Sequence, residues 1–164
     1  MGITKERTKQ WKENNKDRNK ELNRKSDKKR RHLLTKKKRE KYHSNDLVRV
    51  RYSIHSLIGN SFRKKGYGKN TKTQDILGIN FIDFKNHLEK QFLEGMTWEN
   101  RNNWEVDHII PISIARNVDE IIKLNHHTNL RPLWKTENRK KSDKILEEHK
   151  GLMYKLLGED FVLP

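Results

Sequence analysis

The sequence contains no cysteine and few prolines or glycines. Its 164 residues include 3 Pro and 8 Gly. Without cysteine the chain can form no disulfide bond and no thiolate metal site. We therefore expect a protein of the reducing cytoplasm, whose core is held by packing alone.

Long apolar segments are also missing. Only 31% of the residues are hydrophobic, and no apolar run approaches the roughly 20 residues that a membrane-spanning helix needs. The first residues lack the apolar stretch of a secretory signal, and Gly2 followed by Lys5 and Glu6 is a poor myristoylation site. The sequence therefore predicts no membrane partner.

Acidic residues are outnumbered by basic ones, which gives a net charge of +16. Residues 1–45, called the arm from here on, hold 18 Lys and Arg against 6 Asp and Glu, a net charge of +12. Residues 46–164 carry the remaining +4. A polyanion such as nucleic acid is the obvious partner for so basic a segment. The alternative is a solvated charge run without a specific role.

The arm offers little to bury. Its apolar residues follow no sustained helical or heptad spacing: Ile3, Trp11, Leu22, Leu33, Leu34 and Tyr42. The near absence of glycine and proline permits helix. We expect a nucleic-acid-binding arm, helical or disordered, rather than a domain.

Helical periodicity begins after Asn45. One set of apolar residues recurs at helical spacing up to a stop at Gly66: Leu47, Val50, Ile54, Leu57, Ile58 and Phe62. A second amphipathic helix is predicted from Asn80, where Asp83 completes a variant capping box. We interpret residues 46–97 as a helical lead-in that packs and contacts DNA, with its aromatic residues in the core.

Two short β-prone runs, each interrupted by a proline, follow in residues 98–146. The first leads from Trp104 to Ile112, and the second is Leu130–Trp134. Asn117 predicts the cap of a short helix between them, and a polar helix is expected from Thr136 toward Leu146. The tail, residues 147–164, holds enough apolar residues to dock on the core: Leu152, Tyr154, Leu156, Leu157 and Phe161. The predicted class is α+β.

Polar residues stand along these elements in the order Asp-His, Asn, Asn. Asp107 and Asn138 offer a carboxylate and an amide oxygen, a sparse oxygen set of the kind that Mg²⁺ takes together with water and a substrate phosphate. His108, with an ordinary pKa of about 6.5, can accept a proton from an attacking water. The set therefore supplies what the hydrolysis of a phosphodiester bond requires.

The order and spacing of Asp107, His108, Asn129 and Asn138 resemble those of the HNH endonuclease family, in an H-N-N form without the cysteine zinc site. The resemblance covers about residues 98–146 and extends loosely upstream, toward phage-type homing or free-standing members. It implies a small ββα-metal (His-Me finger) core with flanking helices. It also implies Mg²⁺ or Mn²⁺ on Asp107 and Asn138, no zinc, His108 as general base, and Asn129 orienting His108.

The implied function is metal-dependent hydrolysis of DNA. One copy holds one such site, so a monomer or weak dimer is expected to nick one strand of double-stranded DNA. Four basic residues flank the site and are expected to clamp the substrate backbone, solvated helix charge being the alternative: Arg131, Arg139, Lys140 and Lys141. A non-catalytic nucleic-acid-binding protein on a decayed nuclease fold, and a nuclease that is non-specific or acts on RNA, remain alternatives.

The neighbouring positions of Asp107 and His108 impose a geometric condition. In a regular strand, adjacent side chains point to opposite faces. If both serve one phosphate, a bend is expected at or after Asp107, with a distorted strand around Asp107 and His108. His126 and His127 stand just before Asn129 and either touch phosphate or close the loop, with a structural role favoured for at least one.

Overall fold

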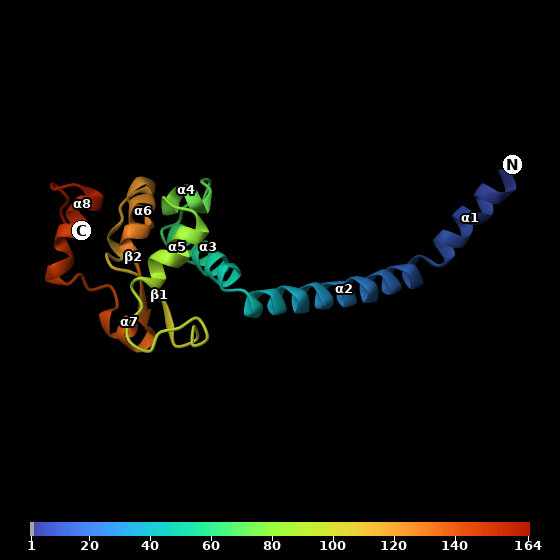
Figure 1. Ribbon diagram of the computed structural model, residues 1–164. Coiled ribbons are helices and arrows are strands. Elements are labelled where there is room, and N and C mark those ends of the chain that lie inside the picture. The colour runs from blue at the N-terminus through green and yellow to red at the C-terminus, as the bar shows by residue number, and fades with distance from the viewer. Residues whose placement is uncertain (1) are drawn as a thin grey trace. The chain divides into compact units, whose positions relative to one another are not determined.

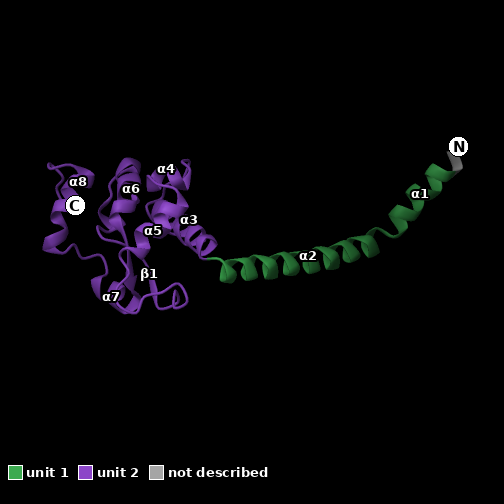
Figure 2. Cartoon of the chain, viewed as in Figure 1, with its two compact units in different colours: residues 1–45 green, residues 46–164 purple. Residues whose placement is uncertain are grey.

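The computed structural model describes residues 2–164, with side chains from residue 4 onward. The chain divides into two compact units, residues 1–45 and residues 46–164, which Figure 2 colours separately. Helices predominate, and the described residues contain one sheet of two strands. The α+β class is therefore confirmed, with the sheet confined to the second unit.

The arm is helical. Helix α1 spans Gly2–Asn14 and α2 spans Lys16–Ser44. No residue of α2 is buried, and the larger apolar side chains of the arm are 51–59% exposed: Trp11, Leu22, Leu33 and Leu34. Ion pairs between residues three or four positions apart support the helix, as between Glu21 and Arg24. The arm is thus a charged surface without a core of its own.

The second unit begins with α3 (Asp46–Lys64), which has the predicted apolar face. Its core residues are at most 2% exposed: Val50, Ile54, Ile58 and Phe62. Gly66 follows with a φ of 78°, in the left-handed region that glycine adopts without strain. The predicted stop is therefore confirmed.

Two shorter helices follow, α4 (Thr73–Leu77) and α5 (Phe81–Glu89). The Oδ1 atom of Asn80 accepts hydrogen bonds from the backbone N–H groups of Ile82 and Asp83, each at 2.9 Å. The Asn80 amide donates in return to the Asp83 carboxylate at 2.6 Å. The predicted N-cap is confirmed, and it fixes where α5 begins, but Asp83 returns a bond to the Asn80 side chain rather than to the backbone N–H that a capping box uses.

Strands β1 (Trp104–His108) and β2 (Leu130–Trp134) pair antiparallel, with Trp104 opposite Trp134 and His108 opposite Leu130. Pro132 is tolerated because a two-stranded sheet leaves one edge of each strand unpaired. The connection between the strands holds α6 (Val118–Leu124), capped as predicted by Asn117, and the 3-10 turns η1 (Ile112–Ile114) and η2 (His127–Asn129).

Helix α7 (Lys135–Lys141) follows β2 directly and contacts both strands, as Figure 1 shows. It ends at Lys141, short of the predicted end near Leu146, because Ser142 takes a positive φ of 50° and leaves the helix. The chain order at the sheet is therefore strand, strand, helix.

One core joins the whole second unit. Trp104 is fully buried, and its ring centroid lies 5.0 Å from that of Phe92 and 5.2 Å from that of Trp98. The tail forms the 3-10 turn η3 (Glu147–His149) and α8 (Lys150–Leu157), and docks on the core through Met153 and Phe161. Tyr154, expected in this contact, is instead 38% exposed. Within residues 2–164 no helix is long and apolar enough to cross a membrane.

Candidate active site

A cleft of about 570 Å³ lies where the end of β1 meets α3 and α7. Its lining comes from α3 and the residue that follows it (Leu57, Asn60, Ser61, Lys64, then Lys65), the end of β1 (Asp107, His108), residues 111–113, and α7 with the next turn (Asn138, Lys141, Ser142, Asp143). The structure thus brings Asp107, His108 and Asn138 to one cavity. Asn129 is fully buried and is not among the residues that line it.

Strand β1 is regular through the Asp107–His108 pair. Asp107 stands opposite Arg131 and His108 opposite Leu130, without a bulge. The distorted strand expected around Asp107 and His108 is therefore absent, whereas the bend expected at or after Asp107 is present, at Ile109 and Ile110. Both side chains nevertheless reach one cleft, since it extends from the α3 side, where His108 lies, to the α7 side, where Asp107 lies.

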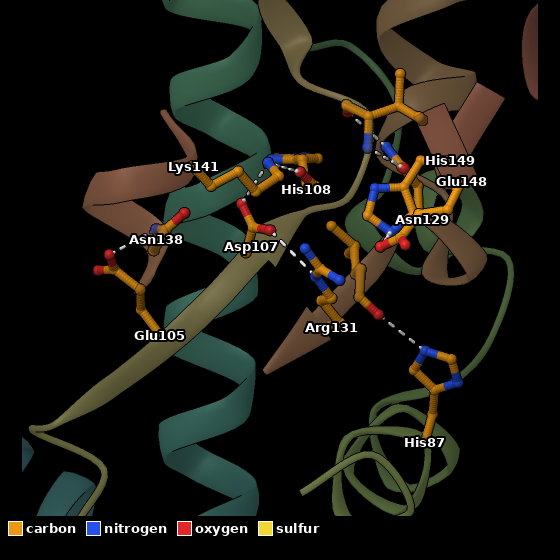
Figure 3. A network of polar contacts seen from close by, with 12 residues as sticks. His87, Glu105, Asp107, His108, Asn129, Arg131, Asn138, Lys141, Glu148 and His149 are labelled. Carbon is orange, nitrogen blue, oxygen red and sulfur yellow. Dashed lines mark hydrogen bonds and ion pairs between the residues drawn. The ribbon is translucent and has the colours of Figure 1, made fainter. Parts of the chain in front are cut away.

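Asp107 is a buried carboxylate between two cations, as Figure 3 shows. Its Oδ1 accepts a hydrogen bond from Lys141 Nζ at 3.1 Å, and its Oδ2 accepts one from Arg131 Nε at 3.4 Å. Lys141 Nζ also donates to the backbone oxygen of His108 at 2.7 Å. Burial raises the pKa of Asp107 above its usual range, and the charges of Lys141 and Arg131 oppose that rise.

The four basic residues predicted to clamp the substrate differ in their surroundings. Lys141, with a side chain only 7% exposed, and the half-buried Arg131 are engaged with Asp107. Arg139 and Lys140 are exposed, and Lys140 pairs with Glu137 at 2.9 Å. Lys141 is therefore part of the cleft wall rather than a solvated charge of α7.

The His108 ring is held by Asn125, a residue that the sequence did not single out. His108 Nε2 lies 2.9 Å from Asn125 Oδ1. Asn125 is fully buried, and its Oδ1 also lies 3.1 Å from Ser61 Oγ on α3. Removal from water lowers the pKa of His108 to about 4, although the hydrogen bond with Asn125 opposes this shift. The ring is therefore neutral at pH 7.

Asn129 fastens the loop that follows β1. Its Oδ1 accepts a hydrogen bond from Ile110 N at 2.8 Å, and its Nδ2 donates to the backbone oxygens of Ile110 and Leu124 at 2.9 and 2.7 Å. The Asn129 side chain therefore holds the backbone two residues after His108 and does not touch the ring. The side chain that contacts the His108 ring itself is that of Asn125.

Replacing Asn129 with alanine is expected to lower the free energy of unfolding by about 3 kcal/mol, because three hydrogen bonds are lost and buried backbone groups lose their partners. Urea titration followed by circular dichroism measures the change. Asn138→Ala is the matched control, since that half-buried side chain makes one hydrogen bond, and its loss should be about 1 kcal/mol. Equal losses in the two variants would contradict the role given to Asn129.

Asn138 presents its amide oxygen toward the cleft. Its Nδ2 donates to Glu105 Oε1 at 2.7 Å, and Figure 3 shows the oxygen turned to the side of Lys141 and Asp107. Among the described residues, no three or more His, Asp or Glu side chains are grouped so as to hold a metal ion. A metal here would rest on Asp107 and Asn138, with water and substrate as its other ligands.

Other histidines of the region have structural contacts. His127 Nδ1 lies 3.0 Å from the backbone oxygen of Leu77, and the His126 ring accepts a hydrogen bond from Thr128 N. The structural role predicted for at least one of them is confirmed. His149 comes near the Asp107 network from the tail, and removal from water and the charge of Arg131 lower its pKa. Spacing along the sequence gave no sign of that approach.

Comparisons with known proteins add one relative. No family model matches the chain, and no solved structure matches it. Over 114 residues it is 35% identical to Uncharacterized protein L426 of Acanthamoeba polyphaga mimivirus, a match that covers 65% of this chain and 49% of the viral protein. The chain thus spans about half the length of this relative.

Proposed function

We propose that this protein is a metal-dependent endonuclease of the HNH type, which hydrolyses phosphodiester bonds in DNA. One observation carries the proposal: Asp107, His108 and Asn138 line a single cleft. The first two end strand β1, and Asn138 lies on α7, the helix that directly follows the antiparallel partner strand β2. The strand, strand, helix order is the one that a ββα-metal core needs.

His108 is the general base in this proposal. Its ring lines the cleft and is neutral at pH 7, so it can take a proton from water as the water attacks the phosphorus. Lys64, Lys65 and Lys141 line the same cleft, which gives a phosphate group a positively charged wall.

Asp107 and Asn138 are the residues that would hold Mg²⁺ or Mn²⁺. One carboxylate and one amide oxygen fit a hard cation that retains several waters. When bound, the metal neutralises charge on the scissile phosphate and on the leaving oxygen. Lys141 Nζ, 3.1 Å from Asp107 Oδ1, supplies positive charge at the same carboxylate, so Asp107 must exchange this partner to serve as a ligand.

A non-catalytic nucleic-acid-binding protein is the second candidate. The observation that favours it is the pairing of both Asp107 oxygens with cations of the chain itself. A carboxylate satisfied in this way needs no metal for stability. The same residues would then hold the fold together and the +16 charge would supply the affinity.

The mimivirus relative supports a virus-borne or phage-borne protein, which we propose acts on double-stranded DNA in the host cytoplasm. Because each copy has one cleft of this composition, a monomer nicks one strand. The arm supplies charge for phosphate contact.

A supercoiled-plasmid assay tests the proposal. With Mg²⁺ or Mn²⁺ the wild-type protein is expected to convert supercoiled DNA to the nicked circle first, with linear DNA appearing only after a second event, and EDTA should stop the reaction. Retarded plasmid with no nicking at any metal concentration would instead favour the binding protein. Parallel incubation with single-stranded RNA separates a DNA enzyme from a nuclease of broader substrate range.

A further inference from the structure

A buried polar bridge connects α3 to the His108 ring. It runs from Ser61 Oγ to Asn125 Oδ1 and from there to His108 Nε2, over distances of 3.1 and 2.9 Å. Ser61 is 4% exposed and Asn125 is fully buried. Neither residue belongs to the Asp-His, Asn, Asn set from which the function is proposed.

The surroundings of Asn125 fix which way its amide points. The backbone oxygen of Ile121 can only accept, and it lies 2.8 Å from Asn125 Nδ2, so the amide nitrogen faces Ile121. The amide oxygen must then face Ser61 and His108. An amide oxygen only accepts, so the His108 nitrogen beside it carries the hydrogen.

We propose that Asn125 is a positioning residue that fixes the orientation and tautomer of the His108 ring, so that Nδ1 is the nitrogen that takes the proton from water. A neutral imidazole carries hydrogen on one nitrogen only. With that hydrogen on Nε2, the lone pair remains on Nδ1. The opposite tautomer would set two lone pairs against each other in a buried space. The proton-transfer part of this inference rests on the proposed nuclease function, and the tautomer does not.

Helix capping alone does not account for the bridge. Asn125 ends α6 through its backbone N–H, which bonds to the oxygens of Ile121 and Ile122, and through its Nδ2. The amide oxygen takes no part in that cap and faces His108. The Ser61 hydroxyl lies 3.0 Å from the backbone oxygen of Leu57 and 3.1 Å from Asn125 Oδ1, so its one hydrogen is shared between two acceptors. Through this shared bond the Asn125 oxygen is connected to α3.

Nitrogen-15 NMR of the full-length, metal-free protein labelled at histidine tests the tautomer directly. At neutral pH the His108 signals are expected to show a protonated Nε2 and an unprotonated Nδ1. Asn125→Leu should shift the population toward the other tautomer, whereas Asn125→Asp keeps an acceptor oxygen and should retain the wild-type pattern. A protonated Nδ1 in the wild-type protein would overturn the inference, whatever the variants do.

Cleavage kinetics give the second measurement. Asn125→Leu is expected to lower kcat on the order of 10- to 100-fold with little change in KM, as is typical when a partner that orients a reactive group is lost. Asn125→Asp should recover most of that loss. If Asn125→Leu folds and keeps the wild-type tautomer of His108 and the wild-type cleavage rate, the only role of Asn125 is to cap helix α6.

Ser61→Ala covers the case in which Asn125→Leu does not fold. It removes the hydroxyl and leaves Asn125 in place, and the minor tautomer of His108 should rise. An unchanged population would remove Ser61 from the bridge. If the wild-type protein does not cut DNA but shows the Nε2–H tautomer, the nuclease function fails while the positioning of the ring stands.

Discussion

His108→Ala is expected to lower the rate of plasmid nicking by about 10²- to 10⁴-fold, the contribution typical of a general base. DNA affinity should be nearly unchanged, because the wild-type ring is neutral at pH 7 and its loss removes no positive charge from the cleft. The initial rate of supercoiled-DNA loss measures the first quantity. A filter-binding or fluorescence titration with EDTA present measures the second.

His32→Ala is the matched control for this variant. His32 lies on the exposed arm helix α2, so the same side chain is removed without touching the cleft. At saturating protein, where a small change in DNA contact by residues 28–41 has no effect, the nicking rate should stay at the wild-type level. Thermal unfolding of both variants shows whether the fold is intact. Full nicking activity in a folded His108→Ala protein would rule out His108 as the base, and with it the division of roles proposed for Asp107 and Asn138.

Local signals account for the parts of the fold that the sequence predicted well. The caps at Asn80 and Asn117, the stop at Gly66 and the apolar face of α3 depend on residues a few positions apart. The proximity of Asp107 to Asn138 follows from the order of the elements. Helix α7 begins directly after β2, and it packs against both β2 and β1. These features need no knowledge of how distant segments pack.

The contacts of His108, in contrast, could be predicted only by knowing how distant segments pack. Ser61 and Asn125 are 64 residues apart in the chain, and their meeting depends on how α3 packs beside the sheet. Asn125 also ends α6, so in the sequence it is indistinguishable from an ordinary helix terminus. The regular pairing of β1 at Asp107 and His108 also depends on distant packing: α3 and α7 both line the cleft at the end of the strand, so both side chains reach it although the chain bends only at Ile109 and Ile110.

Lys141 is a case in which a usable signal was present. It stands three positions after Asn138 on α7, and residues three apart share a helix face. A basic helix suggests solvated charge, but this spacing places Lys141 beside the predicted metal ligand. The structure has it there, 3.1 Å from Asp107 Oδ1. For the position of Lys141, its spacing of three residues from Asn138 was therefore more informative than the basic charge of the segment.

The charge of the arm is unevenly distributed along it. Residues 28–41 hold 9 Lys and Arg and one Glu, which is a net +8 of the arm's +12. In the first half, acidic neighbours pair with the cations, as Glu13 does with Lys16 and Glu21 with Arg24 and Lys25. A helical stretch of 14 residues is about 20 Å long, enough to reach several phosphates of a duplex.

Changing Lys36, Lys37 and Lys38 to glutamine is expected to weaken DNA binding by up to about 500-fold at 0.1 M salt and to reduce the slope of log K against log salt by about 3. Both values follow from the release of about 0.9 counterions per phosphate contact on B-DNA. Glutamine keeps the helix propensity close to that of lysine, so α2 should persist. Titrations at several salt concentrations, with EDTA present, measure the slope.

The control removes the same charge from elsewhere on the arm: Lys16, Arg24 and Lys25 to glutamine. These three side chains lie 2.9–3.6 Å from carboxylates, so they should contribute fewer phosphate contacts, and the slope should fall by clearly less than in the first variant. An equal fall in both would show that DNA responds to net charge rather than to residues 28–41. Both variants leave the second unit unaltered, so nicking at saturating protein should proceed at the wild-type rate in each. This result would separate DNA affinity, which depends on the arm, from the cleavage chemistry at His108.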